Sequence, residues 1–560
     1  MRVFVPIVCF LLCLLALDNV FASPYSDGVY VPPRAIKGGG YGAARGIPYD
    51  ALDRYLSEVT RTHVFRTFEG QNELLKALPN TSKALQVAAG FPVDMAAEEL
   101  FGAPIDDGAR RTYVAAITST DAEALRVQVD LSVLGDGDEV FIVDLYGPKA
   151  FGPYTRADHL ADGRWLPTTE GDTAVLILRT VSDAAPDLAV QGISHFYRSL
   201  QELKELPCNL DLSCEEEVAV QEASSGVGIM VITKTNGSIC CTGSLIANAD
   251  TPADEPYVIT ANHCISEEAH ADQTDIWWDF RSSACNANDA PSLSSLGRSN
   301  GVAMLATNGV LDITLIELDQ VPTGPYGRAY LGWDTRDPAI GEDVVGIHHP
   351  DGTYMRISYG TIQAIDQTSA TVDATYHLQT HVRWDYGVTE GGSSGSCLLF
   401  ADGTYRLCGV LSNGAQHSCT NPLQNNDWYA SFRDFFPAVE DYLTGGEGEG
   451  EGEGEGEGEG EGEGEGEGEG EGEGEGEGEG EGEGEGEGEG EGEGEGEGEG
   501  EGEGEGEGGT PLPRPACAAA FFGGGGSSAP ANGNILVLAA VATTLYMAAR
   551  RRARELPACP

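Results

Sequence analysis

A serine in a hexapeptide of small residues is the first candidate nucleophile in this chain. Residues 391–396 read Gly-Gly-Ser-Ser-Gly-Ser, with Ser394 at the fourth position. A serine hydroxyl attacks a carbonyl only when a base takes its proton and amide N–H groups receive the charge on the oxygen. Because glycine permits turns that aim neighbouring amides at one point, Gly392 and Ser394 are the predicted oxyanion donors. Taken alone, such a hexapeptide is more typical of a loop.

Two further residues could supply what this serine needs. His263 follows an apolar run and precedes Cys264, and Asp312 begins the apolar run 312–318. A carboxylate heading a buried strand is costly unless it is hydrogen-bonded, and orienting a histidine would satisfy it. Separately, His263 could be structural and Asp312 a turn residue. Together they predict a catalytic triad in which Ser394 attacks, His263 transfers the proton and Asp312 holds the histidine tautomer.

The order of these residues and the elements around them predict the fold. The sequence His-Asp-Ser, with gaps of 49 and 82 residues, is that of chymotrypsin-like enzymes, not of subtilisin-like enzymes or α/β-hydrolases. Residues 205–444 hold short apolar runs without long helical periods, so we expect an all-β, chymotrypsin-like double β-barrel. The expected strands are Val227–Ile232, Tyr257–Ala261, Asp312–Leu318, Asp343–His348 and Leu407–Leu411.

The beginning of the chain predicts export. With 560 residues, the chain has room for two or three domains. Residues 1–22 resemble a signal peptide, with Arg2, an apolar run at 3–17 and small residues before a cleavage point at Ser23. An uncleaved membrane anchor is the alternative, although the run is short for one. Export would place the protein in an oxidising compartment, where cysteines pair.

Residues 23–204 contain no cysteine and are predicted to be a pro-region that forms a separate unit. Helical signals are found between residues 50 and 100, for example at 72–78. Short alternating runs between Tyr113 and Val190 predict a small β-sandwich. The glycine cluster 38–42 does not follow a strand, so we expect a linker there and no nucleotide-binding loop.

Residues 445–509 are a low-complexity Glu-Gly linker. The repeat at 447–508 supplies 31 of the 90 acidic residues, and without it the net charge of −58 becomes −27. Glycine and mutually repelling glutamates cannot bury a core, so the linker is expected to be extended and disordered. The acidity that remains argues against nucleic acid as a partner, because phosphate binding needs clustered Lys and Arg.

Residues 510–560 resemble a C-terminal sorting tail of bacterial surface proteins. They contain Cys517, an apolar run at 535–549 and four arginines between 550 and 554. An ordinary C-terminal transmembrane anchor is the alternative, although 15 helical residues reach only about 22 Å, less than the ~30 Å of a hydrocarbon core. The predicted protein is therefore secreted or held at the cell surface, with sorting or anchoring machinery as a partner.

A collinear series of motifs in residues 208–443 resembles the bacterial lysyl endopeptidase family of chymotrypsin-like serine peptidases. The motifs are Cys208-Asn-Leu-Asp-Leu-Ser-Cys214, Cys241-Thr-Gly-Ser-Leu, Thr260-Ala-Asn-His-Cys264, Asp312-Ile-Thr-Leu-Ile-Glu-Leu, Gly332-Trp-Asp, Ile347-His-His-Pro350, Arg356-Ile-Ser and Gly387-Val-Thr-Glu-Gly-Gly-Ser-Ser-Gly-Ser396. The resemblance covers under half of the chain. It implies a secreted endopeptidase that cleaves polypeptides after lysine without a metal or organic cofactor. It also implies three disulfides, Cys208–Cys419, Cys214–Cys285 and Cys241–Cys264.

Three cysteines of this region are then left over. Cys397 and Cys408 lie symmetrically about Asp402-Gly403, a signal for a two-residue hairpin. They would face each other across that hairpin and could form a fourth disulfide. Counting along the strands places them at a hydrogen-bonded pair, which suits a bridge less well, so both outcomes stay open. Cys240 has no obvious partner.

Substrate preference depends on the charge in the pocket. Val388 stands six residues before Ser394, where trypsin-like enzymes carry their pocket aspartate. The family instead carries that aspartate after the last domain cysteine and before an aromatic residue. Asp427, eight residues after Cys419 and before Trp428, matches this pattern. The resemblance therefore assigns it to the substrate ammonium, and a surface aspartate in a polar loop is the alternative.

Other parts of the resemblance concern substrate binding and activation. Ser412 and Gly414 resemble the Ser-Trp-Gly segment that pairs with the substrate backbone. Trypsin-like zymogens place a new N-terminus on an aspartate just before the nucleophile, but here that residue is Ser393. We therefore expect the pro-region, an inhibitor or folding assistant, to be removed without N-terminal insertion, by self-cleavage between Lys204 and Glu205.

Two alternatives to a lysine-specific enzyme remain at this point. A surface binding protein on an inactive protease scaffold would share the fold, but the intact triad counts against it. A protease that prefers arginine or glutamate would share the triad and differ in its pocket. The charge at Asp427 favours a basic residue, lysine or arginine.

Overall fold

The described part of the chain lies in the first of two compact units, residues 1–456 and 457–560. In this computed structural model the described residues are 30–36, 47, 49–77, 84–106, 108, 110–147, 149–184, 187–201, 205–249, 255–289, 291–371, 374–415 and 417–445. The predicted signal peptide, the Glu-Gly repeat and the predicted sorting tail lie outside these residues. Among the described residues, no helix combines the length and the apolar character that crossing a membrane requires.

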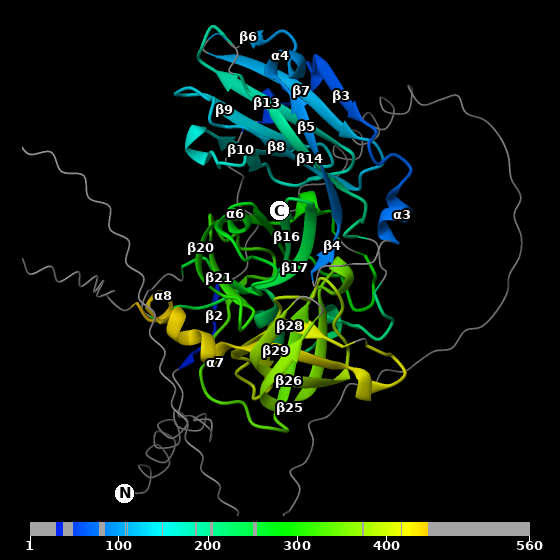
Figure 1. Cartoon of the computed structure of the whole chain (residues 1–560), viewed down its shortest axis with the longest axis vertical. Coiled ribbons are helices and arrows are strands. Elements are labelled where there is room, and N and C mark those ends of the chain that lie inside the picture. Colours follow the sequence, from blue (N-terminus) through cyan, green and yellow to red (C-terminus); the bar gives the residue numbers. More distant parts are fainter. Residues whose placement is uncertain are drawn as a thin grey trace, which may run out of the picture. The chain divides into compact units, whose positions relative to one another are not determined.

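The cysteine-free segment forms two facing β-sheets (Figure 1). One sheet contains β10 (Lys149–Tyr154), β9 (Glu139–Asp144), β13 (Thr173–Thr180), β7 (Arg111–Ser119), β3 (Arg61–Phe65) and β6 (Ile105–Asp106). The other contains β11 (Arg164–Trp165), β8 (Ala124–Val129), β14 (Val190–Phe196), β5 (Ala88–Met95) and β12 (Thr169–Glu170). Helices α2 (Tyr49–Ser57), α3 (Asn72–Lys76) and α4 (Ala97–Leu100) lie where the sequence shows helical signals, and strands β3 and β5 lie among them.

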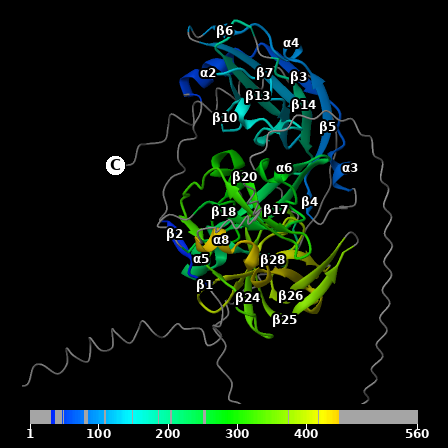
Figure 2. The ribbon, with the colours of Figure 1, turned by 60° about the vertical axis from the view of Figure 1, so that its left-hand side comes forward.

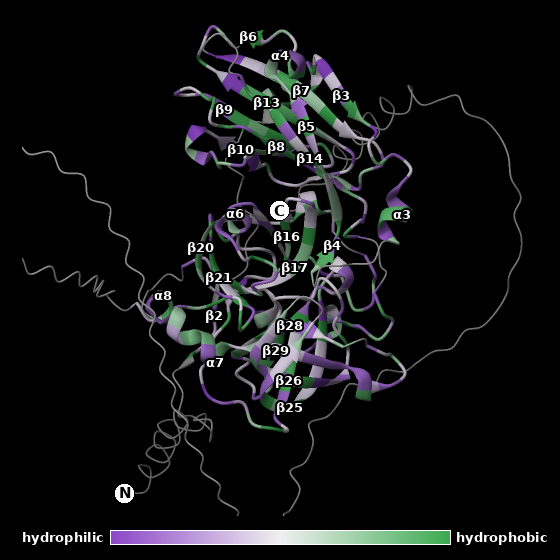
Figure 3. Ribbon diagram, viewed as in Figure 1, coloured by the Kyte–Doolittle hydropathy of each residue, from purple (hydrophilic) through white to green (hydrophobic). Residues whose placement is uncertain are grey.

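Every second residue along a strand contributes an apolar side chain to the core of this sandwich. In β8, Leu125, Val127 and Val129 enter a cluster that also holds Ile142 and Leu176 of the opposite sheet. Successive side chains of a strand point to opposite faces, so the residues between them point away from this core. The strand colours in Figure 3, largely green in β9 and β13, follow this hydrophobic content. The sandwich therefore has a core of its own.

The protease segment forms two closed six-stranded barrels, which confirms the predicted double β-barrel (Figure 2). The first runs β16 (Val227–Lys234), β19 (Thr274–Trp278), β20 (Arg298–Asn308), β21 (Ile313–Leu318), β18 (Tyr257–Thr260) and β17 (Gly237–Leu245), and β16 pairs with β17. The second runs β28 (Leu407–Gly414), β27 (Cys397–Phe400), β24 (Asp343–His348), β25 (Arg356–Ala370), β26 (Thr375–Tyr386) and β29 (Asn426–Ser431), and β28 pairs with β29.

Short elements complete this segment. Helices α5 (Val218–Ser224), α6 (Glu268–Ala271), α7 (Phe432–Phe435) and α8 (Glu440–Thr444) lie outside the barrel strands. The short strands are β1 (Tyr30–Val31), β2 (Arg34–Ile36), β4 (Leu85–Gln86), β15 (Leu210–Asp211), β22 (Arg328–Tyr330) and β23 (Trp333–Asp334). Three of them come from the predicted pro-region: β1 pairs with β23, β2 with β22 and β4 with β17.

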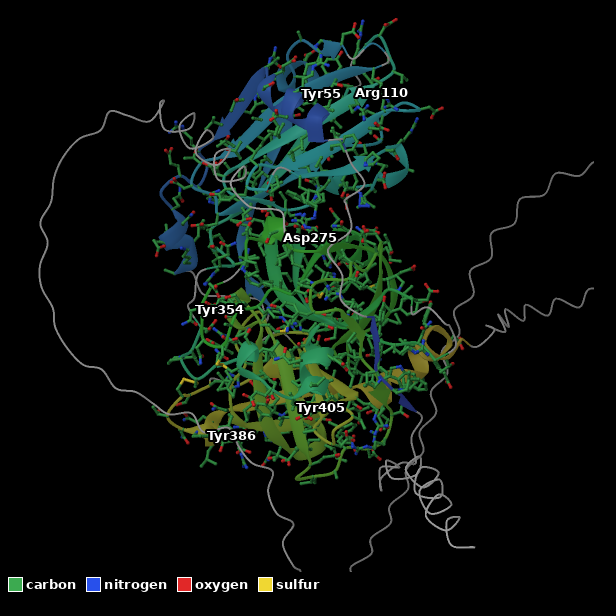
Figure 4. All side chains as sticks on the ribbon, turned by 180° about the vertical axis from the view of Figure 1, so that it is seen from behind. Tyr55, Arg110, Asp275, Tyr354, Tyr386 and Tyr405 are labelled. Carbon is green, nitrogen blue, oxygen red and sulfur yellow. A yellow bond between two sulfur atoms is a disulfide. The ribbon has the colours of Figure 1, made fainter. Side chains whose placement is uncertain are left out.

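A buried polar contact joins the sandwich to the first barrel. Arg126 donates to the carbonyl of Gln273 at 2.8 Å and to the Thr233 hydroxyl at 2.7 Å. Its guanidinium lies 4.0 Å from the carboxylate of Asp275, which Figure 4 labels. Burial lowers the pKa of Arg126 and the Asp275 carboxylate opposes that shift. The cysteine-free segment is therefore bound to the barrel through desolvated, paired charges.

The structure contains disulfides Cys208–Cys419, Cys214–Cys285 and Cys241–Cys264, the pairs that the family resemblance implies. Cys240, Cys397 and Cys408 are buried free thiols.

The predicted two-residue hairpin at Asp402-Gly403, on which a fourth disulfide depended, is wrong. Strands β27 and β28 are joined by residues 401–406, and a register shift after Leu398 places Cys397 opposite Val410. Cys397 packs in the main barrel core, whereas Cys408 packs in a separate cluster with Trp384. The two sulfurs therefore point to different sides of the strand pair, where no bridge can form.

Candidate active site

His263 and Asp312 are brought together by two neighbouring strands of the first barrel. β18 ends at Thr260, three residues before His263, and pairs antiparallel with β21, which begins just after Asp312. The Cys241–Cys264 disulfide joins the residue after His263 to β17. His263 Nδ1 lies 2.9 Å from Asp312 Oδ2, and the His263 backbone N–H donates to Oδ1 at 2.8 Å. The histidine ring and its loop are therefore held by one carboxylate.

The Asp312 carboxylate is fully buried and satisfied by several donors. Besides His263, the hydroxyl of Ser412 on β28 donates to its Oδ2 at 2.6 Å. The predicted strand begins at Asp312, but β21 begins at Ile313, and Asp312 before it has a φ of +71°. This left-handed conformation is uncommon for residues other than glycine and persists only where surrounding contacts enforce it. Ser412, predicted as a substrate-binding residue, thus contacts the triad carboxylate directly.

Ser394 lies in the connection between β26 and β27. Its carbonyl accepts the Thr242 backbone N–H at 2.8 Å, and the next amide, Gly395, donates to Leu411 at 2.9 Å. Thr242 follows Cys241 of the disulfide, and Leu411 precedes Ser412. These bonds place Ser394 between the element that holds His263 and the element that contacts Asp312. The three predicted triad residues therefore lie on neighbouring elements of the two barrels.

The hydrogen bond expected between Ser394 and His263 is not formed in this structure. His263 Nε2 is buried and has no hydrogen-bond partner among the described residues. Nδ1, by contrast, is paired with Asp312. This arrangement leaves Nε2 as the ring atom that can receive the Ser394 proton, and such bonds are often long in free enzymes and tighten when substrate binds.

Contacts on several sides fix the loop that precedes Ser394. Gly392 has a φ of +96°, and a Cβ there would lie 2.7 Å from the His349 carbonyl, so only glycine fits. Ser393 Oγ lies 2.9 Å from Nδ1 of His348, a fully buried histidine whose pKa is lowered to about 3 by that burial. Neutral His348 therefore contacts Ser393, the position at which trypsin-like enzymes carry the aspartate that pairs with a new N-terminus.

Glu390 links this loop to the start of the predicted protease domain. Its carboxylate accepts the backbone N–H of Leu206 and the side-chain amide of Asn209, each at 2.7 Å. Burial raises the pKa of Glu390, whereas these two donors oppose the shift. Glu205, the other side of the predicted cleavage point, forms an ion pair with Arg356. Lys204 lies outside the described residues.

Asp427 is a completely buried carboxylate in β29, and not a surface aspartate. Its Oδ2 accepts the indole N–H of Trp384 at 2.5 Å and the hydroxyl of Thr389 at 2.7 Å. Its Oδ1 receives no hydrogen bond from the described residues. A Cβ on Gly414 would lie 2.1 Å from Oδ1, so glycine at this position leaves room for the carboxylate. A buried carboxylate oxygen is costly unless a donor or a cation lies beside it.

His417 lies next to the free oxygen of Asp427. Its Nε2 is 2.9 Å from Oδ1, although the two atoms are not aligned for a hydrogen bond. Burial lowers the pKa of His417, but the Asp427 and Glu390 carboxylates outweigh that effect and the pKa is raised. A cavity of about 610 Å³ borders this residue, lined by Ala415, His417, Ser418, Leu423, Gln424 and Asn426.

Sequence patterns alone did not single out His417, Trp384, Thr389 or Glu390. Thr389 and Glu390 stand inside the Gly387–Ser396 motif, so the motif contained them without indicating their contacts. A metal site is not implied by the grouping of His263 with Cys241 and Cys264. Both sulfurs are used in the disulfide, and the histidine is paired with Asp312.

Comparisons with known proteins find relatives of this chain and a family model that matches the part of the chain that holds the site. A family model described as lysyl endopeptidase, C-terminal domain, matches residues 205–430. The lysyl endopeptidase of Pseudomonas aeruginosa is 28% identical over 401 residues, which cover 65% of this chain and 82% of that protein. Secreted RxLR effector protein 73 of Plasmopara viticola is 31% identical over 186 residues, 32% of this chain and 42% of that protein. The active form of the Rv3671c protease from M. tuberculosis has a TM-score of 0.30 and 14% identity, covering 43% of this chain and 92% of that one.

Proposed function

Because the chain belongs to the lysyl endopeptidase family of serine endopeptidases, we propose that it hydrolyses polypeptides on the carboxyl side of lysine with His263, Asp312 and Ser394. The buried carboxylate of Asp427, whose Oδ1 has His417 at 2.9 Å but no aligned hydrogen-bond donor among the described residues, is the observation that carries the lysine preference. An ammonium group placed there would satisfy an otherwise costly buried charge, and a charge-assisted hydrogen bond is stronger than a neutral one.

The proposed reaction uses each triad residue in one role. Ser394 Oγ attacks the scissile carbonyl while His263 Nε2 takes its proton and then gives it to the leaving amine. Asp312, bonded to Nδ1, keeps Nε2 free to act as the base and stabilises the imidazolium that forms. The amides of Gly392 and Ser394 receive the oxyanion, and a water molecule then hydrolyses the acyl-enzyme.

Substrate recognition is assigned to strand β28 and the pocket behind it. Gly414 of β28 lies opposite Asp427 of β29, so the backbone that would bind substrate is next to the proposed pocket carboxylate. Backbone groups near Ser412 and Gly414 would hold an extended substrate, as in other peptides that add to a sheet edge. Ser412 has a second role in this proposal, because its hydroxyl also holds Asp312 in place.

The proposal includes a route from synthesis to a processed enzyme. Residues 1–22 would direct export, residues 23–204 would be removed as the pro-region, and residues 510–560 would interact with sorting or anchoring machinery. The acidic linker at 445–509 would separate the protease from that tail. Three disulfides in residues 205–444 suit an oxidising compartment.

The test uses the full chain and four peptides that differ only in the residue before the scissile bond, Lys, Arg, Glu or Phe. Mass spectrometry of the products should find cleavage after Lys that disappears in Ser394→Ala. Cleavage after Arg or Glu would keep the serine mechanism and reject the lysine pocket. No cleavage by a folded, processed protein would instead favour a binding protein on a protease scaffold.

A further inference from the structure

A strand from the predicted pro-region pairs with the protease next to its catalytic residues. β4 is antiparallel to β17, with Leu85 opposite Cys240 and Gln86 opposite Ile239. The pairing continues in the N–H of Val87, which donates to the carbonyl of Ser238 at 2.9 Å. The pro-region thus adds a strand to the barrel, which is the way many proteases and binding domains hold an extended peptide.

The direction of this added strand is that of a substrate beyond its scissile bond. β17 continues from Cys240 through Cys241 to Thr242, whose N–H donates to the carbonyl of Ser394 at 2.8 Å. Because β4 is antiparallel to β17, its chain approaches Ser394 when followed backwards from Gln86 to Ala84. Residues 84–86 therefore run away from the nucleophile in the order of the residues that follow a cleaved bond.

Side-chain contacts agree with this position. Ala84 is fully buried in the cluster that contains Cys241 and Cys264, the disulfide next to His263. Leu85 packs against the loop of the nucleophile, since a Cβ on Gly391 would lie 3.5 Å from the Cβ of Leu85. These two residues thus lie between the disulfide beside the general base and the glycine next to the predicted oxyanion donor Gly392.

Packing further along the strand fixes its register. Leu85, Val87 and Ala88 are buried in one cluster with Cys240 and residues of both the sandwich and the barrel. The carbonyl of Gln86 accepts the hydroxyl of Tyr197 at 3.0 Å. A slip by one residue would put the polar side chain of Gln86 into the buried position of Leu85, so packing favours the observed register.

We propose that residues 84–87 occupy the leaving-group side of the active site as a built-in substrate, and that the enzyme cuts its own chain between Lys83 and Ala84. Lys83 itself lies outside the described residues, and the sequence identifies it as the residue joined to the Ala84 amine. The inference rests on the proposed cleavage after lysine. It adds an internal site to the expected one at Lys204 and makes the uncut pro-region an occupant of the substrate site.

The cut follows the same chemistry as cleavage of a separate polypeptide. Ser394 Oγ bonds to the Lys83 carbonyl carbon, and the C–N bond to Ala84 breaks as His263 passes the serine proton to the amine. Water then hydrolyses the ester, which restores the Ser394 hydroxyl and leaves a carboxyl group on Lys83. The new amine of Ala84 stays on β17, so the pro-region blocks the site until it dissociates.

N-terminal sequencing and intact mass of the purified full chain test this proposal. A fragment that begins at Ala84 is expected from the wild type and not from Ser394→Ala, with a rate that does not change on dilution. Lys83→Gln should lose this fragment. The matched control Lys76→Gln changes a lysine on α3 whose ammonium group pairs with Glu73, and this variant should keep the fragment.

A second variant separates docking from the identity of the cleaved residue. Leu85→Asp keeps Lys83 but places a charge against Gly391, so the Ala84 fragment should form more slowly than in the wild type. The proposal is overturned if the enzyme cleaves added lysine peptides but releases no fragment that begins at Ala84. It is also overturned if Lys83→Gln still releases that fragment. If added peptides are cleaved after another residue type, the proposed function fails first and this inference fails with it.

Discussion

Replacement of Asp427 by asparagine removes the charge of the pocket while it preserves the shape of the side chain. Asp427 is completely buried, and its Oδ2 accepts hydrogen bonds from Trp384 and Thr389. An asparagine carbonyl oxygen can accept the same two bonds. Its amide group would face the position of Oδ1, where it offers hydrogen atoms to a substrate ammonium that needs an acceptor.

The size of the effect follows from burial. Removing one partner of a buried, hydrogen-bonded charge pair costs about 2–5 kcal/mol, because the remaining charge is left desolvated and unpaired. We therefore expect kcat/KM for a lysine peptide to fall about 30-fold to about 5,000-fold in Asp427→Asn. Added salt should have little effect on this fall in kcat/KM, because the site is shielded from solvent.

A matched pair of substrates isolates the ammonium group. Peptides with lysine or norleucine before the scissile bond share the aliphatic stem, and only lysine carries the charge. Asp427→Asn should reduce kcat/KM for the lysine peptide and leave that for the norleucine peptide nearly unchanged. Asp385→Asn, at an exposed position of the same strand as Trp384, is the control and should affect neither.

An equal loss for both peptides would refute this reasoning, because it would mean that Asp427 supports the fold of the site and not the recognition of charge. Unchanged lysine cleavage would refute it more directly, by placing the substrate ammonium elsewhere. Thermal unfolding of Asp427→Asn, compared with the wild type, distinguishes a damaged fold from an altered pocket.

Three other changes have defined outcomes. His417 carries a raised pKa, so its protonated form stabilises the fold at low pH, and this contribution is lost as pH rises through the folded pKa. Protonated His417 also competes with the substrate ammonium, so KM for a lysine peptide should rise as pH falls, and His417→Ser should flatten that rise; an unchanged KM profile would contradict the competition. Ser412→Ala removes a 2.6 Å bond to the carboxylate of Asp312 and should lower kcat about 5- to 30-fold, from about 1–2 kcal/mol; an effect on KM alone would contradict a positioning role. Changing Cys241 and Cys264 to alanine opens a loop with a sequence separation of 23 residues. The free energy of unfolding, measured by denaturant titration, should fall by about 3 kcal/mol. No change would mean that the disulfide does not reduce the conformational entropy of the unfolded chain.

Much of the site could be predicted from the sequence because catalysis requires particular residue types in particular settings. Ser394, His263 and Asp312 each lie in a connection beside the end of a strand, and strands of a small barrel can be recognised from short apolar runs. The family resemblance selects Asp427 by its position after Cys419 and before an aromatic residue, although its local sequence resembles an ordinary polar loop. Its burial could not be predicted, because it depends on how β26 and β29 pair.

The predictions that failed or were missing concern pairing over long or irregular connections. The Asp402-Gly403 signal is present, but the chain turns over residues 401–406, where Asp402 accepts the backbone N–H of Thr404. A register shift then separates Cys397 from Cys408. The pairing of Leu85 with Cys240 joins segments far apart in the chain through a strand of only two residues. No local pattern encodes such a contact, because packing of the whole fold determines it.

The most direct test of the account is to identify the nucleophile by covalent labelling. A serine-directed fluorophosphonate added to the processed enzyme should form one adduct, which peptide mapping should locate at Ser394, and lysine-peptide cleavage should fall in proportion to labelling. The neighbouring Ser393 and Ser396 serve as internal controls, because Ser393 is held by His348 and Ser396 lies inside the fold. An adduct on another serine that abolishes cleavage, or full activity after Ser394 is labelled, would contradict the proposed mechanism.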